Sequence, residues 1–140
     1  MLNEKKMVKV AVGVIIRDQK ILLSKRPDHL HQGGLWEFPG GKIENNETVE
    51  DALGRELAEE LGVQVIRSES LMDVKHDYID KSVLLQVHMV RHFIGGPTEA
   101  DTLGEEGQLV RWVPIEELDH YEFPAANQSI LMAIKNSSLS

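Results

Sequence analysis

Cysteine is absent from the 140 residues of the chain. The protein therefore has no disulfide framework, no thiolate nucleophile and no cysteine zinc site. Long apolar runs are also lacking, because the stretch from Val10 to Ile16 is interrupted at Arg17 and Asp18 and is too short to span a membrane. The polar start of the chain has no cleavage-site pattern. We therefore expect a cytoplasmic protein with neither a secretion signal nor a membrane anchor.

Positive charge is in deficit. Lys and Arg total 15 against 23 for Asp and Glu, which gives a formal net charge of -8. Because cationic residues supply most of the affinity for a nucleic-acid backbone, we expect no nucleic-acid polymer as partner. An acidic protein can still hold a small phosphorylated ligand if a divalent cation and a few local basic residues assist. The length and the 41% hydrophobic content predict one domain over residues 1–140. We expect a monomer or a weak homodimer.

The apolar pattern predicts a mixture of strands and helices. Val8 to Arg17 and Ile21 to Ser24 are two predicted strands joined by a turn, and Pro27 to Gly41 is a predicted long loop of the kind that carries function. Further strands are predicted over Val63 to Ile66, Leu71 to Lys75, Ser82 to Phe93 and Gln108 to Val113. A helical turn is predicted over Pro114 to Leu118, a terminal helix over Ala125 to Lys135, and a frayed end over Asn136 to Ser140. This order predicts an α+β fold, an α/β/α sandwich with a mixed sheet between helices.

A helix is predicted between Thr48 and Gly62. Thr48 can cap its start together with Asp51, and Gly62 can end it in the left-handed conformation. Apolar residues repeat every four positions and predict a stripe packed on the sheet: Val49, Leu53, Leu57 and Leu61.

The same helix is rich in glutamate. At 100° per residue, Glu56, Glu59 and Glu60 fall within an arc of about 100°, with Arg55 at its edge. Two carboxylates about 4 Å apart repel by roughly 4 kcal/mol at an effective dielectric near 20. Mg²⁺ offsets such repulsion and commonly combines one or two carboxylates with water and phosphate oxygens. From the helix alone, a solvated acidic face with an ordinary Arg55–Glu59 ion pair stays open as an alternative.

The surrounding residues form a longer motif. Gly41 is followed by five residues, Glu47, seven residues, and then Arg-Glu-Leu-Ala-Glu-Glu-Leu-Gly-Val from Arg55 to Val63. This segment resembles the Nudix box at every defined position. The resemblance to the Nudix family implies the Nudix fold, in which the box forms a loop, a helix and a loop that bind metal and diphosphate.

The resemblance also implies roles for these residues. Glu56, Glu59, Glu60 and the backbone carbonyl of Gly40 would be metal ligands, and either Glu60 or Glu56 would help to activate water. Arg55 would orient a carboxylate, and Glu47 would brace the loop or contact a metal through water. The implied chemistry is hydrolysis assisted by Mg²⁺, with Mn²⁺ as the substitute, without a covalent enzyme intermediate.

Three further segments resemble the MutT branch of the family, the nucleotide-pool sanitising enzymes. They are Ser24 to Pro27, Leu35 to Lys42 (LWEFPGGK) and Phe123 to Gln128 (FPAANQ). By this resemblance Phe38 and Asn127 would recognise the purine, Arg26 would lie near the nucleotide, and Tyr78 would be the aromatic that this branch carries.

A late glutamate is also implied as a metal contact. Glu106 in the segment Gly104 to Gln108 is its best match, with the adjacent Glu105 as the alternative. Lys42 lies beside the metal loop, where it either contacts phosphate or is an exposed lysine without a functional role.

Asn127 offers both a donor and an acceptor. Oxidation of guanine at C8 turns N7 from an acceptor into a donor, and an amide can read that reversal. The alternative is that Asn127 caps the last helix, and both roles can coexist.

The histidines and tryptophans are weaker candidates. His29 and His31 are expected to face solvent or to lie near phosphate, and His88 and His92 are roughly 13 Å apart along one strand, too far for one metal ion. Trp36 and Trp112 are expected to be packing residues.

The leading hypothesis is a Mg²⁺-dependent hydrolase that converts 8-oxo-dGTP to 8-oxo-dGMP and pyrophosphate, with a small-molecule nucleotide as its partner. One alternative is another nucleotide, of the CTP or dCTP type or a nucleoside diphosphate derivative. A second alternative is a non-catalytic module that senses a nucleotide. Such a module would be expected to lose one or more of the acids, and here all are present.

Overall fold

Eight strands form one mixed sheet in the computed structural model, which describes residues 5–29, 33–98 and 101–137. The strand order is β5-β6-β1-β2-β8-β7, with β3 paired to β2 and β4 paired to β1. The strands are β1 (Lys6–Arg17), β2 (Lys20–Lys25), β3 (Trp36–Glu37), β4 (Gly40–Lys42), β5 (Val63–Asp77), β6 (Lys81–Gly95), β7 (Asp101–Leu103) and β8 (Leu109–Pro114). The β1–β6 pair is parallel and the other pairs are antiparallel. The predicted mixed sheet is therefore confirmed.

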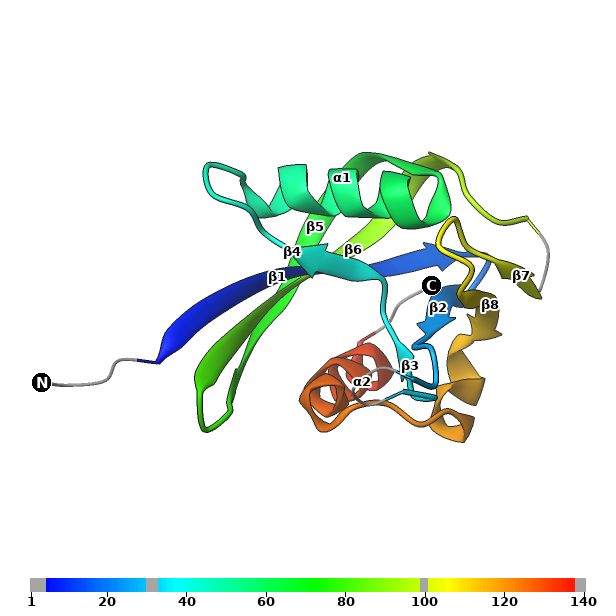
Figure 1. Cartoon of the computed structure of the whole chain (residues 1–140). Coiled ribbons are helices and arrows are strands. Elements are labelled where there is room, and N and C mark those ends of the chain that lie inside the picture. Colours follow the sequence, from blue (N-terminus) through cyan, green and yellow to red (C-terminus); the bar gives the residue numbers. More distant parts are fainter. Residues whose placement is uncertain (1–4, 30–32, 99–100, 138–140) are drawn as a thin grey trace, which may run out of the picture.

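Helices cover both faces of the sheet (Figure 1). On one face, α1 (Val49–Leu61) buries Leu53 and Leu57. On the other, α2 (Gln128–Asn136) and the 3₁₀ turns η1 (Ile115–His120) and η2 (Ala125–Asn127) cover a second core. The predicted α/β/α layering is therefore present. No helix in the described part of the chain is long and apolar enough to cross a membrane.

The ends of α1 match the prediction. The Thr48 hydroxyl accepts a hydrogen bond from the Asp51 N–H at 3.0 Å, and the Asp51 carboxylate accepts one from the Thr48 N–H at 3.4 Å. Gly62 ends the helix in the left-handed conformation with φ 66°. These local contacts fix where α1 begins and ends, and they therefore fix the positions of its acidic residues in the site.

The two strands predicted over Val63 to Ile66 and Leu71 to Lys75 are one strand, so that prediction is wrong. β5 runs antiparallel to β6 over its whole length, with register shifts between Val65 and Arg67, between Arg67 and Ser68, and between Ser70 and Met72. Each shift breaks the two-residue alternation that marks a strand in the sequence. The polar middle of β5 therefore looks like a connection although it is hydrogen-bonded to β6.

The predicted loop from Pro27 to Gly41 also contains regular structure. β3 pairs with β2, and the start of β4 pairs with β1, so the segment folds back on the sheet. The three residues of β7 were not predicted, and the predicted terminal helix begins as a 3₁₀ turn, with α2 starting only at Gln128. His31 and residues 138–140 of the expected frayed end lie outside the described residues.

Candidate active site

A cavity of about 400 Å³ opens where β1, β2, the β3–β4 segment, the end of α1, the β7–β8 turn and η2 meet. Its size lies within the range of small-molecule sites. Val10, Val12 and Leu85 supply apolar lining. The residues predicted from the sequence that line it are Arg26, Phe38, Gly40, Lys42, Glu60, Glu106 and Asn127. Segments far apart in the sequence are thus brought to one place.

Two glycines let the β3–β4 segment lie against its neighbours. A Cβ atom on Gly40 would overlap the carbonyl oxygen of Ala11 in β1, and one on Gly41 would overlap the Glu56 carboxyl group. The preceding Pro39 carbonyl accepts a hydrogen bond from the Gly13 N–H at 2.8 Å. The absence of side chains at these positions therefore brings the loop backbone directly to the acids of α1.

Glu60 is the acid of α1 that reaches the cavity. Its Oε2 atom is buried, and no hydrogen-bond partner for it occurs in the described part of the chain. Burial raises the pKa of Glu60 to about 8, and repulsion from Glu56, Glu106 and Glu37 adds to the shift, while the Gly40 amide opposes it. An orphaned buried carboxylate oxygen among other acids is what a bound cation would satisfy.

Arg55 holds the acids around it. Its guanidinium donates to Glu47 at 2.8 and 3.0 Å, to Glu56 at 2.8 Å and to the Lys42 carbonyl at 3.0 Å. The pair with Glu59 is longer, at 3.8 Å. The bond from Arg55 and the Glu44 N–H lower the pKa of Glu47 to about 2. The ordinary Arg55–Glu59 ion pair is thus the weakest contact of this arginine, which instead ties the loop to the helix.

The acids of the described residues do not form one tight cluster. Within residues 5–29, 33–98 and 101–137, no three acid or imidazole side chains converge closely enough to hold a metal ion. The reason is that Arg55 engages Glu56, and the Glu59 side chain is 59% exposed. Glu106 lines the cavity beside Glu60, whereas Glu105 does not. Glu60 and Glu106, with water and substrate phosphates, fit the open coordination that Mg²⁺ accepts.

The cavity is also lined by the residues predicted to read the base, Phe38 and Asn127. The Phe38 ring is buried and stacks on Phe123, with ring centroids 5.3 Å apart and planes at 20°. Asn127 is the residue before α2, but its side chain makes no capping hydrogen bond. The capping interpretation of Asn127 is therefore wrong, and its amide is available to the cavity that it lines.

Arg26 is fixed by an ion pair that was not predicted. Its Nη1 atom lies 3.1 Å from Oε2 of Glu37 in β3. The Arg26 N–H donates to the Leu35 carbonyl, and the Arg26 carbonyl accepts from the Gly34 N–H, which closes the base of the loop. Burial raises the pKa of Glu37, and Arg26 opposes that shift. In the sequence, Glu37 could have been noticed as an acid between two aromatic residues, Trp36 and Phe38. Other lining residues given no role there are Ser24, Lys25, Gly41 and Gln108.

Tyr78 is not brought to the cavity. It lies in the turn between β5 and β6. The centroid of its ring is 4.7 Å from that of the His76 ring and 5.8 Å from Lys81 Nζ. Lys81 is four positions from Leu85 of the cavity along β6, which corresponds to roughly 13 Å along a strand. The resemblance assigned Tyr78 to the substrate site, but the sequence could not show how far this hairpin extends.

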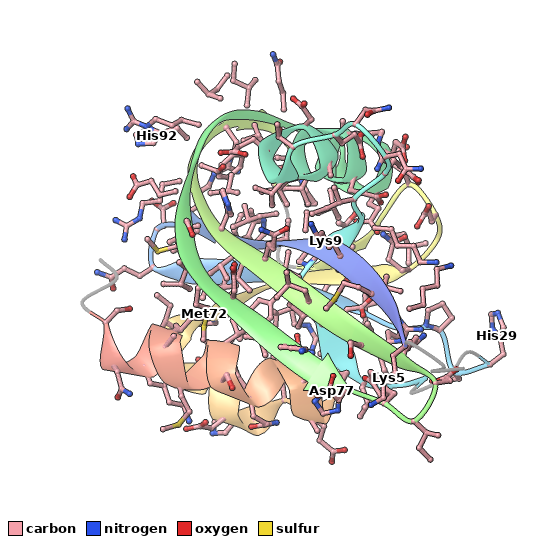
Figure 2. All side chains as sticks on the ribbon, turned by 90° about the vertical axis from the view of Figure 1, so that its left-hand side faces the viewer. Lys5, Lys9, His29, Met72, Asp77 and His92 are labelled. Atoms are coloured by element: carbon pink, nitrogen blue, oxygen red, sulfur yellow. The ribbon has the colours of Figure 1, made fainter. Side chains whose placement is uncertain are left out.

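The remaining candidates have other surroundings. His88 is buried and bonds to Ser68 at 2.9 Å, and His92 contacts Arg67 at 2.8 Å. His29 is exposed and points away from the body of the protein (Figure 2). Trp36 packs against Tyr121, and Trp112 against Phe93, as the packing interpretation predicted.

The chain is similar to known proteins over most of its length. The NUDIX domain family model matches residues 11–133. An 8-oxo-dGTP diphosphatase of Proteus vulgaris is 42% identical over 76% of this chain and 96% of its own length. A CTP pyrophosphohydrolase of Escherichia coli K12 is 37% identical over 91% of each chain. A solved MutT structure from work on Aliivibrio salmonicida and Vibrio cholerae superimposes with a TM-score of 0.78 at 36% identity, covering 92% of this chain and 97% of the other.

Proposed function

The chain belongs to the NUDIX domain family, and we propose that it hydrolyses 8-oxo-dGTP to 8-oxo-dGMP and pyrophosphate with Mg²⁺ as cofactor. One observation carries the proposal. Glu60 and Asn127 line the same nucleotide-sized cavity. The Glu60 Oε2 atom is buried without a hydrogen-bond partner in the described part of the chain, and the Asn127 side chain makes no capping hydrogen bond. The acid serves the phosphates, and the amide serves the base. The free nucleotide pool is the source of such a substrate, so a cytoplasmic location is part of the proposal.

The cations of the cavity are suited to a triphosphate. Three basic residues line it together with Glu60 and Glu106: Lys25, Arg26 and Lys42. A guanidinium binds phosphate oxygens through a fixed fork, while an ammonium acts as a point charge. Because Glu37 holds Arg26 at the wall, less side-chain freedom is lost when phosphate binds.

The acids supply the other half of the chemistry. When bound, a divalent cation neutralises phosphate oxygens and makes water more acidic. Glu60 and Glu106 would hold it, with Glu56 contributing Oε2 while Arg55 holds its Oε1. Glu59 would reach it after side-chain rotation. A nearby positive charge favours the ionised form of Glu60, and either Glu60 or Glu56 would help to activate the attacking water. Arg55 keeps Glu56 and Glu47 in place during this step.

Base selection rests on the amide of Asn127. Its oxygen can accept from the N7–H of the oxidised base, and its nitrogen can donate to O6, whereas normal guanine offers an acceptor at N7. Each good polar discrimination of a base edge contributes about 1–3 kcal/mol. Asn127→Ala removes the acceptor that reads N7–H, and we expect it to lower the preference for 8-oxo-dGTP over dGTP by about tenfold.

The decisive assay compares kcat/KM for 8-oxo-dGTP, dGTP, CTP and dCTP with Mg²⁺, with pyrophosphate release as the readout. The proposal expects 8-oxo-dGTP to be preferred by a large factor. Equal turnover of 8-oxo-dGTP and dGTP would refute the sanitising role while leaving the hydrolase intact.

Variants of the acids test the machinery. Glu59→Gln and Glu60→Gln should each reduce kcat by about 10²-fold or more without unfolding the protein. Glu69→Gln is the matched control, because Glu69 is an exposed acid of β5 outside the cavity and its loss changes the net charge equally. Unchanged kcat in either helix variant would remove that residue from the mechanism.

CTP is the second candidate substrate, because a CTP pyrophosphohydrolase is nearly as similar to this chain as the 8-oxo-dGTP diphosphatases. Hydrolysis of CTP requires the same acids, but the cavity would have to recognise a cytosine in place of an oxidised guanine. A kcat/KM for CTP above that for 8-oxo-dGTP would favour it. If no nucleotide released pyrophosphate or phosphate with Mg²⁺ or Mn²⁺, a nucleotide-sensing module would replace both.

A further inference from the structure

Glu106 approaches the cavity from the turn between β7 and β8, while Glu60 belongs to α1. The turn is closed by its own backbone, because the Gly104 N–H donates to the Gln108 carbonyl at 2.7 Å and the Gly107 N–H donates to the Gly104 carbonyl at 2.9 Å. The distance between the two acids therefore depends on non-covalent contacts between this turn and the helix.

The turn is hydrogen-bonded to the end of α1 at the Glu60 carbonyl group. The Glu60 carbonyl accepts a hydrogen bond from the Glu105 N–H at 2.9 Å. The last carbonyl groups of a helix have no partner within the helix, so this oxygen is free to accept it. The contact fixes the turn at Glu105 but leaves Glu106, one residue further on, without a backbone bond to the helix.

The Gln108 side chain supplies the missing connection. Its Oε1 atom accepts a hydrogen bond from the Glu106 N–H at 3.1 Å. Its Nε2 atom lies 3.5 Å from the Glu60 carbonyl oxygen, a longer and weaker contact. One amide group therefore contacts the backbones of both acids, and it also lines the cavity.

Gly104 makes room for that amide. A Cβ atom at position 104 would overlap the Gln108 side-chain amide. The backbone of Gly104 is not among the left-handed glycines, so alanine is conformationally allowed there. The space left at position 104 is thus needed for the Gln108 side chain and not for the backbone.

From these contacts we propose that Gln108 is a positioning residue that keeps Glu106 opposite Glu60, so that both carboxylates meet one divalent cation. The inference rests on the proposed function, because it takes the two acids as cation ligands. Partners that orient metal ligands typically change metal affinity by about 10–100-fold when they are removed.

Two independent substitutions test it. Gln108→Leu removes the amide, and Gly104→Ala displaces it while leaving Gln108 present. The affinity of each purified variant for Mn²⁺ alone would be measured by electron paramagnetic resonance, without nucleotide. We expect each to bind Mn²⁺ about tenfold more weakly than the wild type, and the double variant to be no worse than either, because both changes remove the same contact.

Matched controls exist for both changes. Gln86→Leu replaces a half-buried glutamine of β6 outside the cavity, and Gly54→Ala adds a methyl group in α1 where nothing lies within 4 Å. Both should bind Mn²⁺ like the wild type. Thermal unfolding of each variant shows whether it is folded, and if Gly104→Ala does not fold, Gln108→Leu decides alone.

Wild-type Mn²⁺ affinity in folded Gln108→Leu would overturn the inference, as would additive losses in the double variant. A wild type that bound no Mn²⁺ would contradict it too. A wild type that binds Mn²⁺ and hydrolyses no nucleotide would refute the proposed function, while weakened binding in the two variants would still support the role of Gln108.

Discussion

Single atoms decide how the acids and the glycine loop fit together. Gly41 and Glu56 come from different elements, yet there is no room for even one added carbon between them. The sequence motif fixed both residues without showing that they touch. Spacing within a helix can be derived from its geometry, whereas contact between a loop and a helix depends on tertiary packing.

Gly41→Ala should therefore displace the Glu56 carboxyl group. Since this group is the end of a side chain, it can rotate away from Arg55 at a modest cost of about 1–3 kcal/mol. We expect kcat to fall about tenfold or more while the protein remains folded, measured by steady-state kinetics beside thermal unfolding. Gly54→Ala, in open space on α1, is the control and should keep wild-type kcat. Normal activity in Gly41→Ala would show that the orientation of Glu56 is unimportant.

Glu60 should make the stability of the metal-free protein depend on pH. Its pKa is raised from 4.5 to about 8 in the folded state. The folded state therefore retains a proton that the unfolded state releases, and stability is lost as the pH rises from about 4.5 through 8. In EDTA at pH 8.5 we expect Glu60→Gln to melt at least ~3 °C above the wild type, which corresponds to about 1 kcal/mol for a domain of this size. At pH 4.5 the two should melt alike.

Excess Mg²⁺ should reduce that difference, because a cation favours the ionised Glu60. Equal melting temperatures at pH 8.5 in EDTA would mean that burial does not raise the pKa of Glu60. The measurement separates this property from catalysis, since it needs no substrate.

At the scale of elements, α1 is the part that the sequence predicts best. Its start, its end and its apolar stripe all depend on residues within four positions of each other. Thr48→Ala should remove the capping box and lower the free energy of unfolding by about 1 kcal/mol. At saturating Mg²⁺ we expect kcat to stay close to the wild-type value, because Thr48 is at the opposite end of the helix from Glu60.

Denaturant unfolding measures this loss, and Thr98→Ala at an exposed position is the control that should show none. A large fall in kcat for Thr48→Ala would mean that the cap also positions the acids.

Other elements were predicted less well for identifiable reasons. β3, β4 and β7 are two or three residues long and exist only because a neighbouring strand is present to pair with. The polar middle of β5 is held by β6 across register shifts. Tyr78 was assigned to the site by the family resemblance, but its position depends on the length of that hairpin. In each case the deciding contact is distant in the sequence.

At the scale of the whole molecule, the site needs both layers of the sandwich. Glu60 comes from α1, Glu106 from the β7–β8 turn, and Asn127 from η2 just before α2. We expect a single domain, in which the two cores unfold together. Leu57→Ala and Ile130→Ala, one in each core, should each lower the unfolding free energy by about 2–5 kcal/mol.

Calorimetry tests this directly, since both variants should show one transition with matching calorimetric and van't Hoff enthalpies. Two separate transitions would divide the chain into independently folding parts and contradict the single domain.

The register shifts of β5 also affect how the protein behaves in a crowded solution. β5 is the outermost strand of the sheet, and a long open edge is a template for pairing with another chain. Bulges bend and twist such an edge, and charged side chains such as Arg67 and Lys75 disfavour the approach of a second strand. The irregularity that hid this strand in the sequence is thus a safeguard against aggregation.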